Sequence, residues 1–106
     1  MRPNSLTRFS DISFLVLSSL ADGPKHGYAM IQDIQQFSGT RLEPGTLYGA
    51  ITRLERQGWI EPLPTDERRR PYSVTPDGLA ALREYVRTLE QVASVGRRRL
   101  VDAEHP

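Results

Sequence analysis

Residues 44–58 read PGTLYGAITRLERQG, and this stretch decides the fold that the sequence predicts. Pro44 suits the first turn of a helix, where a missing backbone N–H costs nothing. Leu47, Ile51 and Leu54 follow at i, i+4 and i+7, the spacing of the inward stripe of an amphipathic helix. We therefore predict a helix from Pro44 to about Gly58 that packs on the rest of the domain through one face.

The opposite face of this helix carries small residues in its first half and arginines in its second. Its members are Thr46, Gly49, Ala50, Arg53, Arg56 and Gln57. The major groove of DNA is about 12 Å wide, so a helix that lies in it needs short side chains where its backbone comes nearest and long donors where it must reach. The pattern therefore favours a helix that reads the major groove.

A second helix should precede this one. It is expected to begin near His26 or Gly27 and to end at Ser38 and Gly39, because apolar residues recur at spacings of three over this segment. The face that they form comprises Tyr28, Ile31, Ile34 and Phe37. We therefore predict a short amphipathic helix with these four side chains on its buried face.

The first helix should begin around Ser10 and Asp11, where a capping side chain and a carboxylate favour a helix start, and stop at Gly23 and Pro24. Apolar residues cover most of its circumference, namely Ile12, Phe14, Leu15, Val16, Leu17 and Leu20. A helix that is apolar on so many sides must be buried on more than one of them. We expect it to pack on its own domain and also on a partner chain.

The segments Trp59–Leu63 and Pro71–Thr75 predict the two strands of a hairpin, joined by a polar loop over residues 64–70. Apolar and polar side chains alternate in them, as in strands with one covered face. Pro62 and Pro71 each remove a backbone donor, so the strands should be short and lie at an edge. Three helices followed by such a hairpin predict a mainly α-helical fold, the winged helix-turn-helix.

A long helix should end the chain. It opens with Thr75, Pro76 and Asp77, where threonine can cap, proline fits the first turn and a carboxylate meets the positive helix end. Apolar residues then repeat at alternating spacings of three and four, at Leu79, Leu82, Val86, Leu89 and Ala93. Continued to Leu100, the helix would be about 36 Å long, too long for a small domain to cover. This heptad seam predicts pairing with a second copy of the chain.

The chain has 106 residues, enough for one compact domain with an appended helix and too few for two independent cores. We expect a flexible arm over residues 1–9, a winged helix-turn-helix DNA-binding domain over residues 10–76 and a dimerisation helix over residues 77–102. Apolar residues make up 38% of the chain and charged residues 25%. These fractions are typical of a globular protein.

The composition disfavours several functions. The chain has no cysteine and only two histidines, so thiol chemistry and a cysteine-based zinc site are excluded. No glycine-rich phosphate loop, nucleophile elbow or paired histidine motif appears, so we expect neither an enzyme nor a bound cofactor or metal. The longest apolar run, Phe14 to Leu17, is far too short to cross a bilayer, and no basic-then-apolar leader opens the sequence. We expect a cytoplasmic protein without a membrane partner.

The charges matter through their positions, since the formal net charge is only +1. Arginine supplies all of the basic side chains except Lys25, and two arginine triplets stand out, at residues 68–70 and 97–99. The planar guanidinium suits phosphates and guanine edges better than an ammonium does. The first triplet falls in the hairpin loop, where it would lie beside a bound duplex.

Four motifs, in order along the chain, resemble those of the PadR-type transcriptional regulators of bacteria, in particular the short branch without a separate C-terminal domain. They are HGY at 26–28, PGTLYGAITRLE at 44–55, GWI at 58–60 and VTPDG at 74–78, and the match spans roughly residues 12–90. The resemblance implies a repressor that binds DNA as a homodimer, with the third helix in the major groove and an interface built from the first and last helices. It also implies a small aromatic effector that releases the DNA.

Two-fold symmetry predicts a palindromic operator with half-sites about 34 Å apart. The candidates for DNA binding lie at the start of the second helix, on the third helix and in the hairpin loop: Lys25, His26, Tyr28, Gly45, Thr46, Tyr48, Arg53, Arg56, Arg68, Arg69 and Arg70. The candidates for the dimer interface lie on the first and last helices: Ile12, Leu15, Val16, Leu79, Leu82, Val86, Leu89 and Ala93.

Many of these residues also have a purely structural interpretation. Lys25 and His26 could cap or pack the second helix, and the spacing of Tyr28 places it with the core. Thr46 and Tyr48 could edge the core or cap the third helix. For these positions the sequence leaves both interpretations open.

Acidic residues lie near both groups of expected DNA contacts. Asp66 and Glu67 precede the arginines of the hairpin loop and could neutralise them within one surface turn. Glu43 stands where the family often has a serine, and its carboxylate would weaken binding to phosphates unless it is turned away. The alternative function is therefore a winged-helix adaptor whose arginines meet an acidic protein partner. Salt-dependent binding to DNA separates the two.

Overall fold

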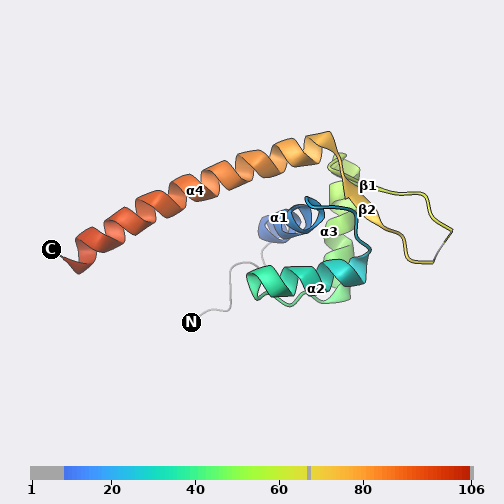
Figure 1. The fold of residues 1–106 in the computed structure, drawn as a ribbon, viewed down its shortest axis with the longest axis horizontal. Helices are drawn as coiled ribbons and strands as arrows, with labels where there is room; N and C mark the ends of the chain where they lie inside the picture. Colours follow the sequence, from blue (N-terminus) through green and yellow to red (C-terminus); the bar gives the residue numbers. More distant parts are fainter. Residues whose placement is uncertain (1–8, 67, 106) are drawn as a thin grey trace.

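The computed structural model describes residues 9–66 and 68–105 and confirms the predicted order of elements (Figure 1). The elements are α1 (Phe9–Leu20), α2 (Gly27–Ser38), α3 (Pro44–Gln57), β1 (Ile60–Pro62), β2 (Tyr72–Val74) and α4 (Pro76–Glu104). The first three helices gather beside the hairpin, whereas α4 extends away from them, so the molecule measures 62 × 29 × 20 Å (Figure 1). The arm predicted for residues 1–9 lies outside the described part of the chain except for Phe9, the first residue of α1.

The three-helix bundle encloses one hydrophobic core. The predicted stripe of α3, Leu47, Ile51 and Leu54, is buried in it. The largest buried partners from α1 and α2 are Val16, Leu17, Leu20, Met30 and Ile34. Each large apolar side chain that is buried in this way contributes about 1.5–3 kcal/mol to folding. The core therefore fixes the angle at which α3 is presented to its surroundings.

The buried face of α2 differs from the predicted one. Tyr28 is 60% exposed and Phe37 is 50% exposed, whereas Met30 is fully buried together with Ile34. The apolar residues at spacings of three drift around the helix, because 3.6 residues make one turn, and only the middle of that series meets the core. The interpretation of Tyr28 as a core residue is therefore wrong, and its ring is available at the surface.

The hairpin is short, as its prolines predict. Ile60 pairs with Val74, Glu61 with Ser73 and Pro62 with Tyr72 in an antiparallel register. Lys25, in the connection between α1 and α2, adds a further bridge, because its backbone N–H and C=O both bond to Tyr72, at 3.2 and 3.0 Å. The start of α2 is thereby attached to the hairpin through the backbone.

Helix α4 begins at a cap that also fastens it to the hairpin. The Thr75 hydroxyl accepts a hydrogen bond from the Gly78 N–H (3.1 Å) and donates to the Gly58 carbonyl (2.7 Å). Gly78 lies so close to the Trp59 carbonyl that a Cβ at residue 78 would be 2.1 Å from its oxygen. Glycine is therefore the residue that lets α4 approach the hairpin at this angle.

Helix α4 then runs for 29 residues to Glu104, just past the predicted end at residue 102, and passes Gly96 without interruption. Its first half lies against α1 and the hairpin, and its second half extends beyond the three-helix bundle (Figure 1). Among the helices in the described ranges, none combines the length and the apolar character needed to span a bilayer. The observed arrangement is the winged helix-turn-helix fold with one long C-terminal helix.

Candidate nucleic-acid interface

The outward face of α3 lies opposite its four buried residues, Leu47, Ala50, Ile51 and Leu54. Helical geometry places a stripe of Gly45, Gly49, Thr52 and Arg56 in the middle of that face. Ala50 was expected here, but it is fully buried, because it lies 100° from Gly49 on the side of the core. The face therefore carries less side-chain bulk in its first two turns than the sequence interpretation assumed.

Thr52 is a residue of this face that the sequence interpretation missed. It is exposed, and its hydroxyl donates to the Tyr48 carbonyl one turn earlier, at 3.0 Å. One helix face carries residues at spacings of four, three and four, namely Gly45, Gly49, Thr52 and Arg56. This pattern could have identified Thr52 from the sequence. The expectation relied on residue size alone and left this position out.

Arg53 and Glu43 mark the flank and the start of the same face. Arg53 is half-buried, and loss of solvation lowers the pKa of its guanidinium below the usual value, with the charge of Arg56 acting in the same direction. Glu43 is exposed and is the N-cap residue of α3, but its side chain makes no capping hydrogen bond. Thr46 and Tyr48 are also exposed, so they belong to the surface of α3 rather than to its core.

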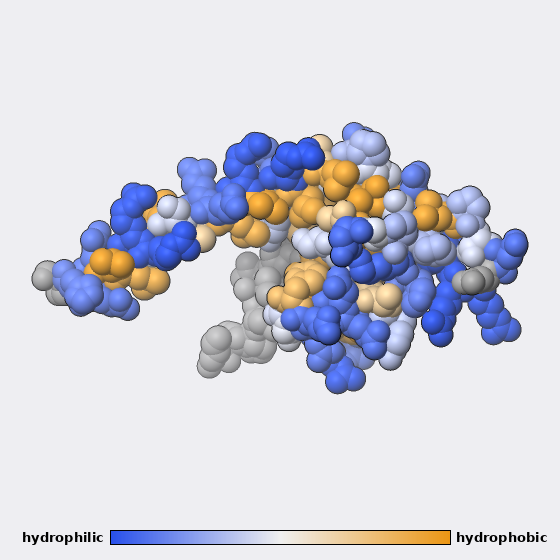
Figure 2. Space-filling view, in the orientation of Figure 1, coloured by the Kyte–Doolittle hydropathy of each residue, from blue (hydrophilic) through white to orange (hydrophobic). Residues whose placement is uncertain are grey.

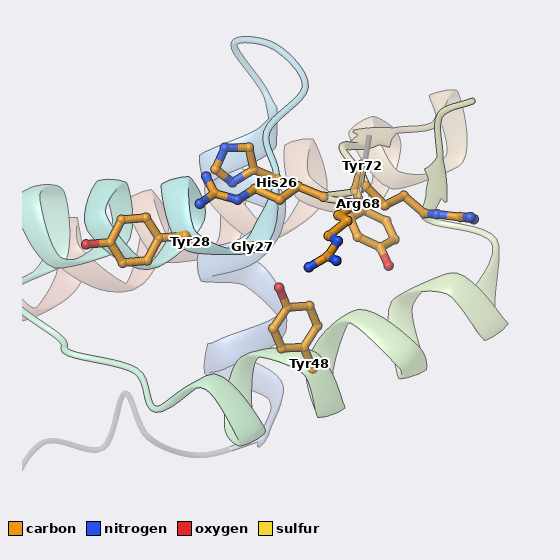
Figure 3. A pocket seen from close by; sticks show the side chains of 8 residues that line it. His26, Gly27, Tyr28, Tyr48, Arg68 and Tyr72 are labelled. Atoms are coloured by element: carbon orange, nitrogen blue, oxygen red, sulfur yellow. The ribbon is translucent and has the colours of Figure 1, made fainter. Parts of the chain in front are cut away.

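A groove of about 450 Å³ lies between the start of α2, the helix α3 and the hairpin loop (Figure 3). Its lining residues are His26, Gly27, Tyr28, Tyr48, Arg68, Arg69, Arg70 and Tyr72. None of these described residues is acidic. The structure thus brings together three predicted groups, from α2, α3 and the hairpin loop, around a surface with three guanidinium groups and three phenol rings.

Tyr48 and Gly27 form the floor of this groove. Tyr48 points from α3 toward the start of α2 (Figure 3), and a Cβ on Gly27 would lie 2.2 Å from the Tyr48 hydroxyl oxygen. Tyr72 faces the same space from β2 (Figure 3), and burial raises the pKa of its hydroxyl, with the charge of Glu55 adding to the effect. The absence of a side chain at Gly27 therefore sets where the Tyr48 ring can lie.

His26 is half-buried at the edge of the groove. It is the N-cap residue of α2, but its side chain makes no capping hydrogen bond, and its buried Nδ1 has no hydrogen-bond partner among the described residues. The capping role that was held open for His26 is therefore wrong. His26 lines the groove, but the Nδ1 of its imidazole is buried from solvent.

Lys25 does not lie in the groove. Its ammonium donates to the Ser19 carbonyl in the last turn of α1 and to the Asp22 carboxylate, and its side chain is only 19% exposed. A cation at the C-terminal end of a helix is stabilised by the free carbonyls there. The hydrogen bond from Lys25 and its charge also lower the pKa of Asp22. Lys25 therefore holds the α1–α2 connection, which is the packing role that the sequence left open beside a contact with DNA.

Packing within one protomer buries some of the residues that were candidates for the dimer interface. Ile12 and Val16 are buried in the core of their own protomer, with Val16 fully inaccessible, so their side chains offer no surface to a second chain. Leu82 is buried as well, whereas Val86 and Leu89 are exposed. Burial in the single chain leaves little of Ile12, Val16 and Leu82 for a partner, and the expectation that they meet one stays a prediction.

Apolar surface continues along α4 beyond the seam that the heptad pattern predicted. The residues that it missed are Val92, Leu100 and Val101, all more than half exposed. Hydrophobic surface follows the underside of α4, while hydrophilic side chains gather at the tip of the hairpin (Figure 2). The exposed apolar residues of α4 therefore extend over most of its length.

An aromatic cluster lies where α1, α4 and the hairpin meet. The rings of Phe14 and Tyr85 are stacked, 3.9 Å apart and nearly parallel, and Trp59 lies 6.0 Å from Phe14 at a tilt of 45°. A shallow apolar hollow of about 360 Å³ adjoins these three rings. In the described ranges, no group of acidic and histidine side chains is arranged to hold a metal ion.

A helix-turn-helix bundle with an arginine-bearing hairpin beside its third helix defines a winged helix-turn-helix protein. The sequence model of the transcriptional regulator PadR-like family matches residues 16–84. The chain belongs to the PadR-like family of transcriptional regulators.

The chain is also similar to individual proteins and solved structures. A transcriptional regulator of Mycobacterium tuberculosis is 42% identical over 74% of this chain and 75% of its own length. An uncharacterized 37.1 kDa protein of a Streptomyces fradiae transposon is 44% identical over 81% of this chain, which spans only 25% of that relative's length. A solved transcriptional regulator of Clostridium thermocellum is 26% identical, with a TM-score of 0.77 over 92% of this chain and 97% of its own.

Proposed function

We propose that the protein binds DNA sequence-specifically as a homodimer and represses transcription in the cytoplasm. The observation that carries the proposal is the groove beside α3, where Arg68, Arg69 and Arg70 share one surface with Tyr48 and His26. Guanidinium groups bind phosphates strongly and without regard to sequence, so they would position the duplex. The outward face of α3 would then lie in the major groove and read base edges.

The exposed apolar surface of α4 supports the homodimer. Leu89 is 48% exposed and Val92 is 62% exposed in the single chain. A second copy of the same helix offers a surface of the same apolar character, and a two-fold axis between the copies would place the two α3 helices on one face of the duplex. On this proposal residues 10–76 form the DNA-binding unit, residues 77–102 form the dimerisation helix, and the operator is palindromic.

The aromatic cluster supports control by a planar apolar effector. The hollow beside Phe14, Trp59 and Tyr85 lies between α1 and the proposed dimerisation helix, next to the residue that precedes β1, so a ligand bound there would change the angle between the two helices. A flat aromatic compound can stack on such rings. The expected result is an increase in thermal stability on adding the compound, together with release of DNA.

The central test is selection of binding sites from a random-sequence duplex library, followed by a titration of the selected duplex at several salt concentrations. The proposal predicts enrichment of a palindrome with half-sites about one helical turn apart, and an affinity that falls steeply as salt rises. Equal binding to all sequences would overturn sequence-specific recognition. Binding that is absent even at low salt would favour the adaptor function, in which the arginines meet an acidic protein.

A further inference from the structure

The conformation of Thr52 limits what this side chain can recognise. Its hydroxyl donates to the Tyr48 carbonyl at 3.0 Å, a bond from residue i to residue i−4 that threonine commonly makes within helices. The only proton of the hydroxyl is therefore already used inside the protein. What Thr52 has left to offer is a hydroxyl oxygen that can only accept a hydrogen bond and its γ-methyl.

The surroundings of Thr52 leave that methyl accessible. Gly45 and Gly49 precede it on the same stripe and carry no side chains. A Cβ placed on Gly45 would meet no atom within 4 Å, whereas one on Gly49 would lie 3.6 Å from Nη1 of Arg53. Arg56 follows it one turn later and is exposed. A duplex that approached the first turns of α3 closely would therefore come within reach of Thr52, with the guanidinium of Arg53 at the flank of the stripe.

We propose that Thr52 is a specificity-determining residue that recognises the 5-methyl group of a thymine in each half-site. In the major groove, thymine is distinguished from cytosine by this methyl and by an acceptor oxygen in place of a donor amine. A threonine with its proton committed has no donor for that oxygen, whereas its methyl packs on the methyl of the base. The inference rests on the proposed function and goes beyond it by naming one base and the atom that is read.

The test uses the full chain and the duplex that it selects from the random-sequence library. Each thymine of the half-site is replaced in turn by deoxyuridine, which removes only the 5-methyl group. With the replacement made in one half-site only, the wild type should lose affinity by about four-fold at one of the thymines, the value of one buried methyl group. Substitutions at the other thymines should have a smaller effect.

Two variants separate the methyl from the hydroxyl. Thr52→Val keeps the methyl and removes the hydroxyl, so it should retain the four-fold preference for thymine over deoxyuridine at that position. Thr52→Ser keeps the hydroxyl and removes the methyl, so it should bind the two duplexes equally. Both variants change an exposed side chain, and unchanged thermal unfolding would verify that each remains folded.

The outcomes distinguish this inference from the proposed function. A selected palindrome in which deoxyuridine is tolerated at every position would overturn the role of Thr52 and leave sequence-specific binding intact. The same holds for a selected half-site without thymine, or for a preference that survives in Thr52→Ser and is lost in Thr52→Val. Failure to select any sequence would overturn both.

Discussion

At the scale of single residues, Gly27 and Tyr48 determine the shape of the groove. The ring of Tyr48 fills the space where a side chain on Gly27 would lie, and the two residues come from different helices. Tyr48 is half exposed, so its ring can swing away when it is displaced. A change at residue 27 should therefore act on the groove surface more than on the folding of the core.

Gly27→Ala should weaken DNA binding by displacing the Tyr48 ring while changing the free energy of unfolding by less than about 1 kcal/mol, because the ring moves into solvent. The measurement is a comparison of DNA affinity and thermal unfolding with those of the wild type. In a background of Tyr48→Ala, the same Gly27→Ala change should have no further effect on affinity. Additive losses in the double variant would contradict this coupling.

Lys25 and Arg69 differ in role although both are cationic residues near α2 or the hairpin. Lys25→Met should lower the free energy of unfolding by about 1 kcal/mol, because it removes the bonds to Ser19 and Asp22. Arg69→Ala should leave unfolding unchanged and reduce the salt dependence of DNA binding by about one unit of slope. Chemical denaturation and DNA titrations at several salt concentrations would measure the two effects. A reduced salt slope for Lys25→Met would show that its ammonium reaches the duplex after all.

At the scale of elements, the sequence predicts the helix boundaries well because their signals are local. Gly39 and Gly58 follow α2 and α3 in left-handed conformations, with φ of 75° and 79°, and Pro44 occupies the first turn of α3. Such positions depend on the preference of one residue for one backbone conformation. The start and end of each helix could therefore be predicted within a few residues.

The side of each helix that is buried was harder to predict. Tyr28 and Ala50 were assigned to the wrong sides, because burial depends on how the helices pack and not only on their apolar spacing. For the same reason the sequence did not decide whether Lys25 packs against α1 or contacts DNA. The sequence predicted the residues of the groove as three separate groups. The backbone bridge from Lys25 to Tyr72 joins the start of α2 to the hairpin, and no sequence pattern indicates it.

Two glycines in α4 predict opposite effects of the same substitution. Gly78→Ala should destabilise the fold by about 1–3 kcal/mol, because its Cβ would meet the backbone oxygen of Trp59, which cannot move without the hairpin. Gly96→Ala should stabilise it by about 0.5–1 kcal/mol, because nothing lies within 4 Å of the new Cβ and alanine favours a helix. Thermal unfolding of the two variants side by side is the measurement. Equal effects would show that Gly78 is not required for the contact with the hairpin.

At the scale of the whole molecule, the exposed apolar surface of α4 predicts the oligomeric state. Val92→Glu should yield monomers at micromolar concentration, because it places a charge where two helices would pack, and it should weaken binding to the palindrome. Gln91→Glu adds the same charge about 100° around the helix and should leave the dimer intact. Analytical ultracentrifugation measures both. A wild-type monomer at that concentration would refute the dimer.

Because the second half of α4 extends beyond the bundle of its own chain, that half has little tertiary packing to maintain its helix. A solitary helical segment of this length is marginal in water. If a second copy supplies the missing packing, the melting temperature must rise with protein concentration, since dilution separates the copies. The concentration of this regulator in the cell would then set how well it resists proteolysis. Newly synthesised monomers at low concentration would be degraded faster than chains that have formed a dimer.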